Sequence, residues 1–259
     1  MRLIENWKEF LKEVADPETI DTSSFEVKSV LHPDFWEDEE RLNEEIGDRL
    51  YSIAKEFFKS LDLNWVDLLD VTFTGSLANY TWSSYSDIDL HVIVDYNQVD
   101  ENQELVVDFL RKSGALWNRS HKILIKGFEV EVYIQDANEP HYSTGIYSVK
   151  KDEWIEKPSQ IEPEIDAMNI QKKAATLMDD VDEVYELFTN EEYEPAYKLA
   201  EKIKDKIRKF RQAGLERGGA YSVENLAFKV LRRNEYLRKL SSLKVMSYDK
   251  MMSINGEHP

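Results

Sequence analysis

Two aspartates separated by one residue begin an alternating apolar segment, shortly after a Gly-Ser pair that ends another apolar segment. The first segment is Val71-Thr-Phe-Thr74, Gly75-Ser76 follows it, and the second is Asp87-Ile-Asp-Leu-His-Val-Ile-Val94. Their composition and alternation predict two short β-strands. Because successive side chains of a strand point to opposite faces, Asp87 and Asp89 lie on the same face. The fold must therefore accommodate two neighbouring carboxylates at one end of a strand.

Neighbouring carboxylates repel each other unless a multivalent cation lies between them. The chain has no Cys and only five scattered His, so oxygen atoms are the expected ligands, and these favour Mg²⁺ or Mn²⁺. Gly75 allows a ligand to approach the backbone closely, and Ser76 with its neighbouring N–H groups can hold phosphate oxygens. The pattern indicates a site for a metal ion together with a phosphate group.

A third carboxylate is expected from the segment Ile123 to Ile134, which is typical of a long strand bent at Gly127. Glu129 and Glu131 share one face of this strand, so either can complete the ligand set. Three carboxylates of this kind hold two metal ions roughly 3.5–4 Å apart in in-line phosphoryl transfer. The spacing alone leaves both glutamates as candidates.

Gly75-Ser76, Ser86-Asp87-Ile-Asp89-Leu and a later acid within an apolar strand resemble the DNA polymerase beta superfamily of nucleotidyltransferases. The resemblance is close over residues 71–95 and looser over 122–134. It implies that Asp87 and Asp89 hold two Mg²⁺ (or Mn²⁺) ions and that Gly75 and Ser76 receive the β- and γ-phosphates of an NTP. It also implies that the third acid touches the metal near the acceptor hydroxyl. Glu131 is favoured for this role because its neighbours are both Val.

The fold class expected from the pattern and the resemblance is α+β. It consists of a small mixed β-sheet nucleotidyltransferase core with flanking helices, followed by an all-helical C-terminal domain. We expect N-terminal helices packing on the core over 1–62, the catalytic core over 63–160 and the helical domain over 161–259. The expected helices are about 1–15, 35–61 (capped by Asp34), 101–112, 164–188, 194–213 and 222–241, with an edge strand near 146–149 and a loose tail after about 248.

The helical half carries a basic segment in an otherwise acidic chain. Between Glu201 and Lys244 there are thirteen basic and five acidic residues, so this segment has a net charge of +8. The rest of the chain has a net charge of −26, which gives the total of −18. Such asymmetry indicates either a solvated face or contact with an anion. Asn225, Lys229 and Arg233 recur at helical spacing, and the corresponding helix of several family members contacts the triphosphate. The resemblance therefore adds Lys229 and Arg233 to the expected nucleotide-binding residues.

Three other residues near the motif have ordinary structural interpretations. His91 shares the face of the two aspartates, but a histidine within a strand more often serves packing than catalysis. Tyr80 and Trp82 can stack on a base, although such aromatic residues more often anchor a loop. None of the three is needed for the predicted chemistry.

The predicted enzyme transfers a nucleoside monophosphate from an NTP to an acceptor hydroxyl and releases pyrophosphate. A small molecule or a protein is the favoured acceptor, and tRNA comes next; the net charge of −18 argues against general DNA binding. The alternative is an inactive protein with the same fold that binds a partner, such as the antitoxin of a toxin–antitoxin pair. With no apolar run long enough for a membrane span and no signal peptide, a cytoplasmic location is expected.

Overall fold

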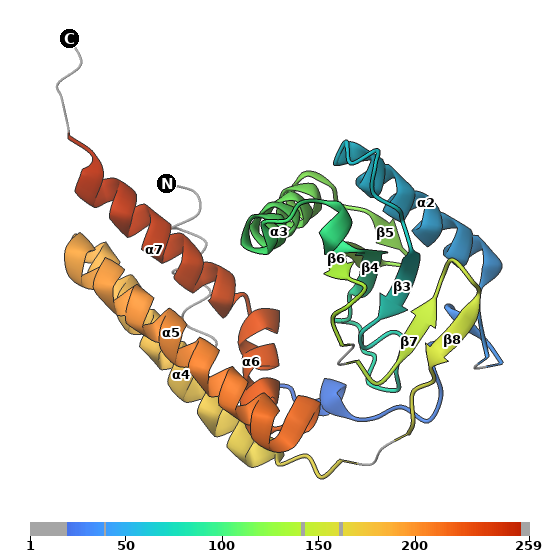
Figure 1. The fold of residues 1–259 in the computed structure, drawn as a ribbon. Helices are drawn as coiled ribbons and strands as arrows, with labels where there is room; N and C mark the ends of the chain where they lie inside the picture. The colour runs from blue at the N-terminus through green and yellow to red at the C-terminus, as the bar shows by residue number, and fades with distance from the viewer. Residues whose placement is uncertain (1–19, 39, 141–142, 161–162, 255–259) are drawn as a thin grey trace. The chain divides into compact units, whose positions relative to one another are not determined.

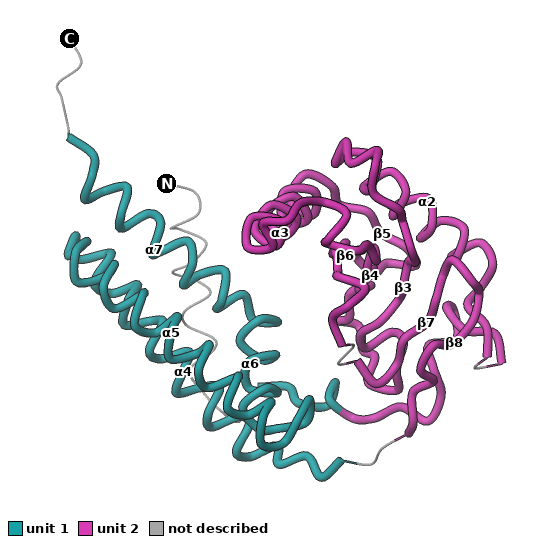
Figure 2. The backbone as a smooth tube through the Cα atoms, in the orientation of Figure 1, with its two compact units in different colours: residues 1–25, 163–259 teal, residues 26–162 magenta. Residues whose placement is uncertain are grey.

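The computed structural model describes residues 20–38, 40–140, 143–160 and 163–254. They form two compact units, residues 1–25 with 163–259 and residues 26–162 (Figure 2). Residues 26–62 thus belong to the same unit as the sheet. The expected helix at 1–15 lies outside the described residues.

The sheet unit contains a six-stranded mixed sheet in the order β5-β6-β4-β3-β7-β8 (Figure 1). A two-stranded β1-β2 ribbon accompanies it. Its elements are β1 (Trp36–Glu37), β2 (Arg41–Leu42), α2 (Glu44–Ser60), β3 (Asp70–Thr74), β4 (Ile88–Val94), η3 (Tyr96–Gln98), α3 (Gln103–Ser120), β5 (Leu124–Ile125), β6 (Phe128–Asp136), β7 (Ile146–Ser148) and β8 (Glu153–Glu156). Among the described strands only β4 and β6 are parallel neighbours, and α3 provides the crossover between them.

One face of the central strands packs against the helices. Leu90 and Val92 of β4 share a buried core with Ile53 and Phe57 of α2 and with Leu110 of α3. The intervening residues of β4 point to the opposite face, as alternation requires. The polar positions of β4 are therefore held at the sheet surface by the apolar ones behind them.

The helical unit is built from η2 (Ser23–Phe25), α4 (Ala167–Thr189), α5 (Tyr193–Gly218), η4 (Gly219–Tyr221), α6 (Val223–Arg233) and α7 (Tyr236–Met252). It has its own apolar core, to which Ile20 and Phe25 from the N-terminal segment contribute. A mixed sheet with helices and a helical C-terminal region were both expected, and the structure shows both. In the described part of the chain no helix is long and apolar enough to span a membrane.

The helix predicted over 35–61 is wrong in its first part. Asn43, not Asp34, caps α2, and its side chain accepts a hydrogen bond from the N–H of Ile46 at 3.3 Å. Trp36 is instead drawn into the core, where its ring stacks on that of Trp154 with centroids 4.4 Å apart. Burial of these aromatic rings favours a β-ribbon where Asp34, as a capping residue followed by several acids, predicts the start of a helix.

Two predictions for the strands also need correction. The segment 123–134 is not one bent strand, because Lys126 and Gly127 both have positive φ (51° and 88°) and turn the chain into a β5–β6 hairpin. The strand near 146–149 exists as β7 but is not an edge strand, since it lies between β3 and the unpredicted β8. The charged residues of β8, Glu153-Trp-Ile-Glu156, hide its β-character from a sequence pattern.

The helices differ from the prediction mainly in where they end. The helix expected at 222–241 is two helices, because Glu235 adopts a left-handed conformation (φ 61°) between α6 and α7. α3 continues to Ser120 instead of stopping near 112, and α7 continues to Met252 beyond the expected start of a loose tail. Gly114 lies within α3 without ending it, and neither Gly nor Pro separates α6 from α7, so the sequence carries no strong signal for these helix ends.

Candidate functional site

The register of three neighbouring strands brings the motif residues together at one end of the sheet. Asp89 pairs with Thr74 of β3 on one side and with Glu131 of β6 on the other. Neighbouring strands are about 4.8 Å apart, so Asp89 and Glu131 are close neighbours on the same face. Asp87 precedes β4 by one residue and reaches that face as well. The three acids favoured by the sequence therefore share one surface.

Gly75 lies against the carboxylate of Asp89. A Cβ placed on Gly75 would be 1.9 Å from Oδ2 of Asp89, and the residue has a φ of 82°. Both observations require glycine. A side chain would clash with Asp89, and the positive φ is one that other residues rarely adopt. The Gly-Ser turn is thus a close-approach point directly above Asp89.

The loop between β3 and β4 is held in place from several directions. The indole N–H of Trp36 donates to the carbonyl of Leu77 at 2.7 Å, and the hydroxyls of Ser76 and Ser86 are hydrogen-bonded at 2.7 Å. Ser86 Oγ also accepts from the N–H of Ser83 at 3.0 Å. These bonds fix Ser76 beside the strand end and link it to the residue just before Asp87. The sequence motif includes Ser86 but does not predict its contact with Ser76.

Tyr133 is a residue of this site to which the sequence pattern assigns no role. Its hydroxyl donates a hydrogen bond to Oε2 of Glu131, and its ring centroid lies 5.3 Å from that of His91. Burial raises the pKa of Tyr133 above its ordinary value, and the hydrogen bond to Glu131 and the negative charges of Glu131, Asp89 and Asp87 raise it further. The phenol therefore stays protonated and lies within electrostatic reach of all three acids. The sequence indicates the place of Tyr133 only through the alternation of β6, which puts it on the same face as Glu131.

The structure distinguishes the two candidate glutamates by position. Glu131 is half-buried and pairs with Asp89, whereas Glu129 is exposed and pairs with Leu124 of β5. Glu131 is consequently the acid directly across from the Asp-x-Asp pair.

The donor chemistry fits a hard divalent cation, because every acid at this strand end offers carboxylate oxygens. The absence of a side chain on Gly75 lets the Asp89 carboxylate lie directly against the turn. However, among the described residues no group of three or more His, Asp or Glu side chains is arranged to hold one metal ion. The backbone thus aligns the three acids, while their side chains do not form a closed metal site.

A cavity of about 360 Å³ opens beside Glu131, between α3 and β6. Glu131 and Tyr133 line it from the strand, and Arg111 and Asn118 line it from the helix. Cavities of this volume accept small organic ligands. A second molecule can therefore approach the acids from the α3 side.

Lys229 and Arg233 lie on α6 of the helical unit, one helical turn apart. Arg233 donates a hydrogen bond to the hydroxyl of Ser24, and its guanidinium lies 4.2 Å from the ring centroid of Phe25. Asn225, expected on the same polar stripe, is buried, accepting from Arg211 and donating to the carbonyl of Ala220. That stripe is therefore not uniformly solvent-facing.

The aromatic residues of the loop act as anchors. The indole of Trp82 donates to the carbonyl of Val30 at 2.9 Å, and its ring lies 4.5 Å from that of His32. Tyr80 is buried, and its carbonyl accepts from the N–H of Lys28 at 2.7 Å. The ordinary interpretation of both residues fits these contacts.

In comparisons with known proteins, no family model, no curated protein and no solved structure matches this chain.

Proposed function

We propose that this protein is a metal-dependent nucleotidyltransferase that moves a nucleoside monophosphate from an NTP to an acceptor hydroxyl. The observation that carries the proposal is the alignment of Asp89 with Glu131 across β4 and β6, beneath the glycine turn that ends β3. Asp87, two residues before Asp89, lies on the same face. The other residues of the site hold this arrangement in place. The proposed reaction needs no separate catalytic base.

Asp87, Asp89 and Glu131 would hold Mg²⁺ or Mn²⁺. When bound, these ions supply charge neutralisation on the triphosphate and activation of the acceptor hydroxyl. The chain's own contribution is positioning. Gly75 lets the Asp89 carboxylate approach the backbone, Ser76 supplies a hydroxyl that Ser86 orients, and protonated Tyr133 holds Glu131.

The cavity between α3 and β6 supports an acceptor of small-molecule size, because it opens beside Glu131 and not beside the glycine turn. Arg111 and Glu139 give its rim both signs of charge. A small polar acceptor bearing a hydroxyl fits this lining better than an extended polyanion.

The proposal is tested with Asp87→Asn and Asp89→Asn variants of the full chain. The purified protein is incubated with each α-³²P-labelled NTP, Mg²⁺ or Mn²⁺ and a cell extract, and label transferred to any acceptor is counted. We expect the wild type to transfer label and each variant to lose at least about 10³-fold in rate, because the metal-holding carboxylates act together. Asp95→Asn, which changes an acid beyond the other end of β4, serves as the matched control.

Melting temperatures of all four proteins separate chemistry from folding. Removing one of two adjacent acids should leave stability unchanged or raised, because their mutual repulsion is relieved. Full transfer by both variants would overturn the proposal. If the wild type transferred no label but bound a protein partner, the inactive binding protein would take its place.

A further inference from the structure

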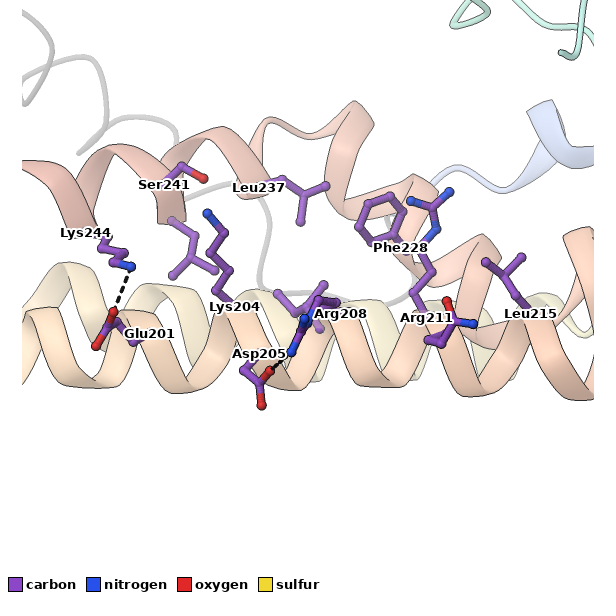
Figure 3. A pocket seen from close by; sticks show the side chains of 13 residues that line it. Glu201, Lys204, Asp205, Arg208, Arg211, Leu215, Phe228, Leu237, Ser241 and Lys244 are labelled. Atoms are coloured by element: carbon purple, nitrogen blue, oxygen red, sulfur yellow. Dashed lines mark hydrogen bonds and ion pairs between the residues drawn. The ribbon is translucent and has the colours of Figure 1, made fainter. Parts of the chain in front are cut away.

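The helical unit contains a groove of about 630 Å³ between α5 on one side and α6 with α7 on the other (Figure 3). All of its lining residues belong to this unit, and none is one of the carboxylates of the sheet. Its floor is apolar, formed by Ile207, Leu215, Phe228, Leu237 and Leu240. Grooves of this size, with an apolar floor and a few polar groups, accept small organic ligands.

The rim of the groove carries an excess of positive charge. Lys204, Arg208, Arg211 and Lys244 line it, against the two acids Glu201 and Asp205. Both acids are already engaged: Glu201 pairs with Lys244 at 2.8 Å, and Asp205 pairs with Arg208 at 2.5 Å and with Lys209 at 2.7 Å. Among the described residues no acid pairs with Lys204, so its charge is left to attract an anion.

Lys204 and Ser241 form a pair of donors across the groove. Figure 3 shows the lysine side chain reaching from α5 toward α7, where Ser241 lies. Both residues are exposed, so an ammonium and a hydroxyl are available on opposite walls. This combination suits the oxygens of a phosphate group.

Further along the groove, Arg211 and Phe228 form a flat platform. The guanidinium carbon lies 4.1 Å from the ring centroid, and Nε donates to Oδ1 of Asn225 at 3.1 Å. Burial lowers the pKa of Arg211, and the like charge of Arg232 lowers it further. A guanidinium fixed on an aromatic ring is a surface on which planar groups stack.

We propose that this groove binds a nucleotide of monophosphate size, with its phosphate between Lys204 and Ser241 and its base over the apolar floor beside Arg211 and Phe228. The volume of the groove favours a single nucleotide. A nucleic-acid strand would need a longer groove, because its contacts extend over several nucleotides. Because none of its lining residues is one of the sheet carboxylates, this inference does not depend on the proposed transfer reaction. The groove would be a nucleotide site in addition to the one proposed at the sheet, suited to sensing a product or an effector.

The test measures binding of AMP, GMP, CMP and UMP to the full-length Asp87→Asn protein in EDTA, by isothermal titration calorimetry. EDTA and the substitution suppress metal-dependent binding at the sheet. Inorganic phosphate and adenosine are titrated separately to measure the two halves of the ligand. We expect one saturable site for at least one nucleotide and much weaker binding of either half.

Three variants in this background locate the site. Lys204→Glu reverses the unpaired charge and should raise Kd at least about tenfold, because it replaces attraction by repulsion at the phosphate. Ser241→Phe should block the groove with a similar loss. Lys202→Glu is the matched control, because it makes the same charge change on the same helix but does not line the groove; it should alter Kd by less than about twofold.

Melting curves check that each variant is folded, and both groove substitutions change exposed side chains. The proposal is overturned if no nucleotide binds saturably. It is also overturned if Lys204→Glu and Ser241→Phe bind as the parent does, or if Lys202→Glu loses as much affinity as Lys204→Glu.

Discussion

Gly75 and Gly127 both have positive φ, but only Gly75 has an atom in the space that a Cβ would fill. In Gly127→Ala we therefore expect only the conformational cost of a left-handed alanine, about 1–2 kcal/mol. In Gly75→Ala the same cost is joined by a clash with the Asp89 carboxylate, so we expect a larger loss of stability together with loss of nucleotidyl transfer. Urea unfolding and the transfer assay measure both. Equal effects of the two substitutions would show that Gly75 is not a close-approach point.

Glu131 and Glu129 offer a second comparison between residues of one strand. We expect Glu131→Gln to abolish transfer while NTP binding persists, because Glu131 pairs with Asp89 and lies beside the acceptor cavity. Glu129→Gln should cost tenfold or less, on the order of 1.4 kcal/mol, through indirect effects. Rapid-quench rates and calorimetric NTP affinities check this. The opposite pattern would assign the third ligand to Glu129.

At the residue scale, the sequence predicts side chains whose positions follow from alternation. Asp87, Asp89 and Glu131 reach one face because a strand repeats every two residues and the apolar positions select which face is buried. The hydrogen bond from Tyr133 to Glu131 and the contact between Ser76 and Ser86 depend on rotamers and loop conformation. Neither follows from a periodic pattern, so the sequence does not predict them.

At the scale of elements, α3 protects the free edge of β6. β5 pairs only with the first two residues of β6, and the side chain of Asn118 substitutes for a neighbouring strand further along. Its amide nitrogen donates to the carbonyl of Val132 at 3.0 Å, and its oxygen accepts from the N–H of Val132 at 2.9 Å. An unpaired strand edge exposes such groups to water or to other chains. These two hydrogen bonds hold the strand that carries Glu131.

We expect Asn118→Ala to destabilise the sheet unit by about 1–3 kcal/mol, because it leaves two backbone groups of β6 without partners. Ser120→Ala on the same helix removes only a bond to the carbonyl of Leu116 and should cost less than about 0.5 kcal/mol. Urea denaturation gives both values, and hydrogen exchange should accelerate selectively at the Val132 amide. An unchanged exchange rate at that amide would show that Asn118 does not protect it.

Which elements the sequence predicts depends on what stabilises them. β3, β4 and most of the long helices are marked by apolar periodicity within the element itself. The β1–β2 ribbon depends instead on contacts with distant residues, such as that of Trp36 with Trp154, and a local pattern cannot reveal these. The break between α6 and α7 rests on the left-handed conformation of Glu235, which the residue type does not suggest.

At the scale of the whole molecule, the sheet unit is an insertion between two parts of the helical unit. Residues 26–162 form one compact unit, while the flanking residues 1–25 and 163–259 form the other. Each has its own apolar core. The two ends of the insertion meet, because the side-chain amide of Gln160 donates to the carbonyl of Lys28 at 3.3 Å. Both ends can thus leave the sheet unit at the same point.

We expect residues 26–162, expressed alone, to fold into the same sheet, because the core of this unit draws every buried residue from within its own bounds. The fragment should unfold cooperatively in urea, and its near-ultraviolet circular dichroism should show its packed tryptophans. Residues 163–259 alone lack Ile20 and Phe25, two buried members of the helical core, and should lose several kcal/mol relative to that unit in the full chain. Adding back residues 20–25 through a short linker should restore part of the loss. If the sheet fragment gave only a broad, non-cooperative transition, its core would require the helical unit, and the insertion would not be an independent folding unit.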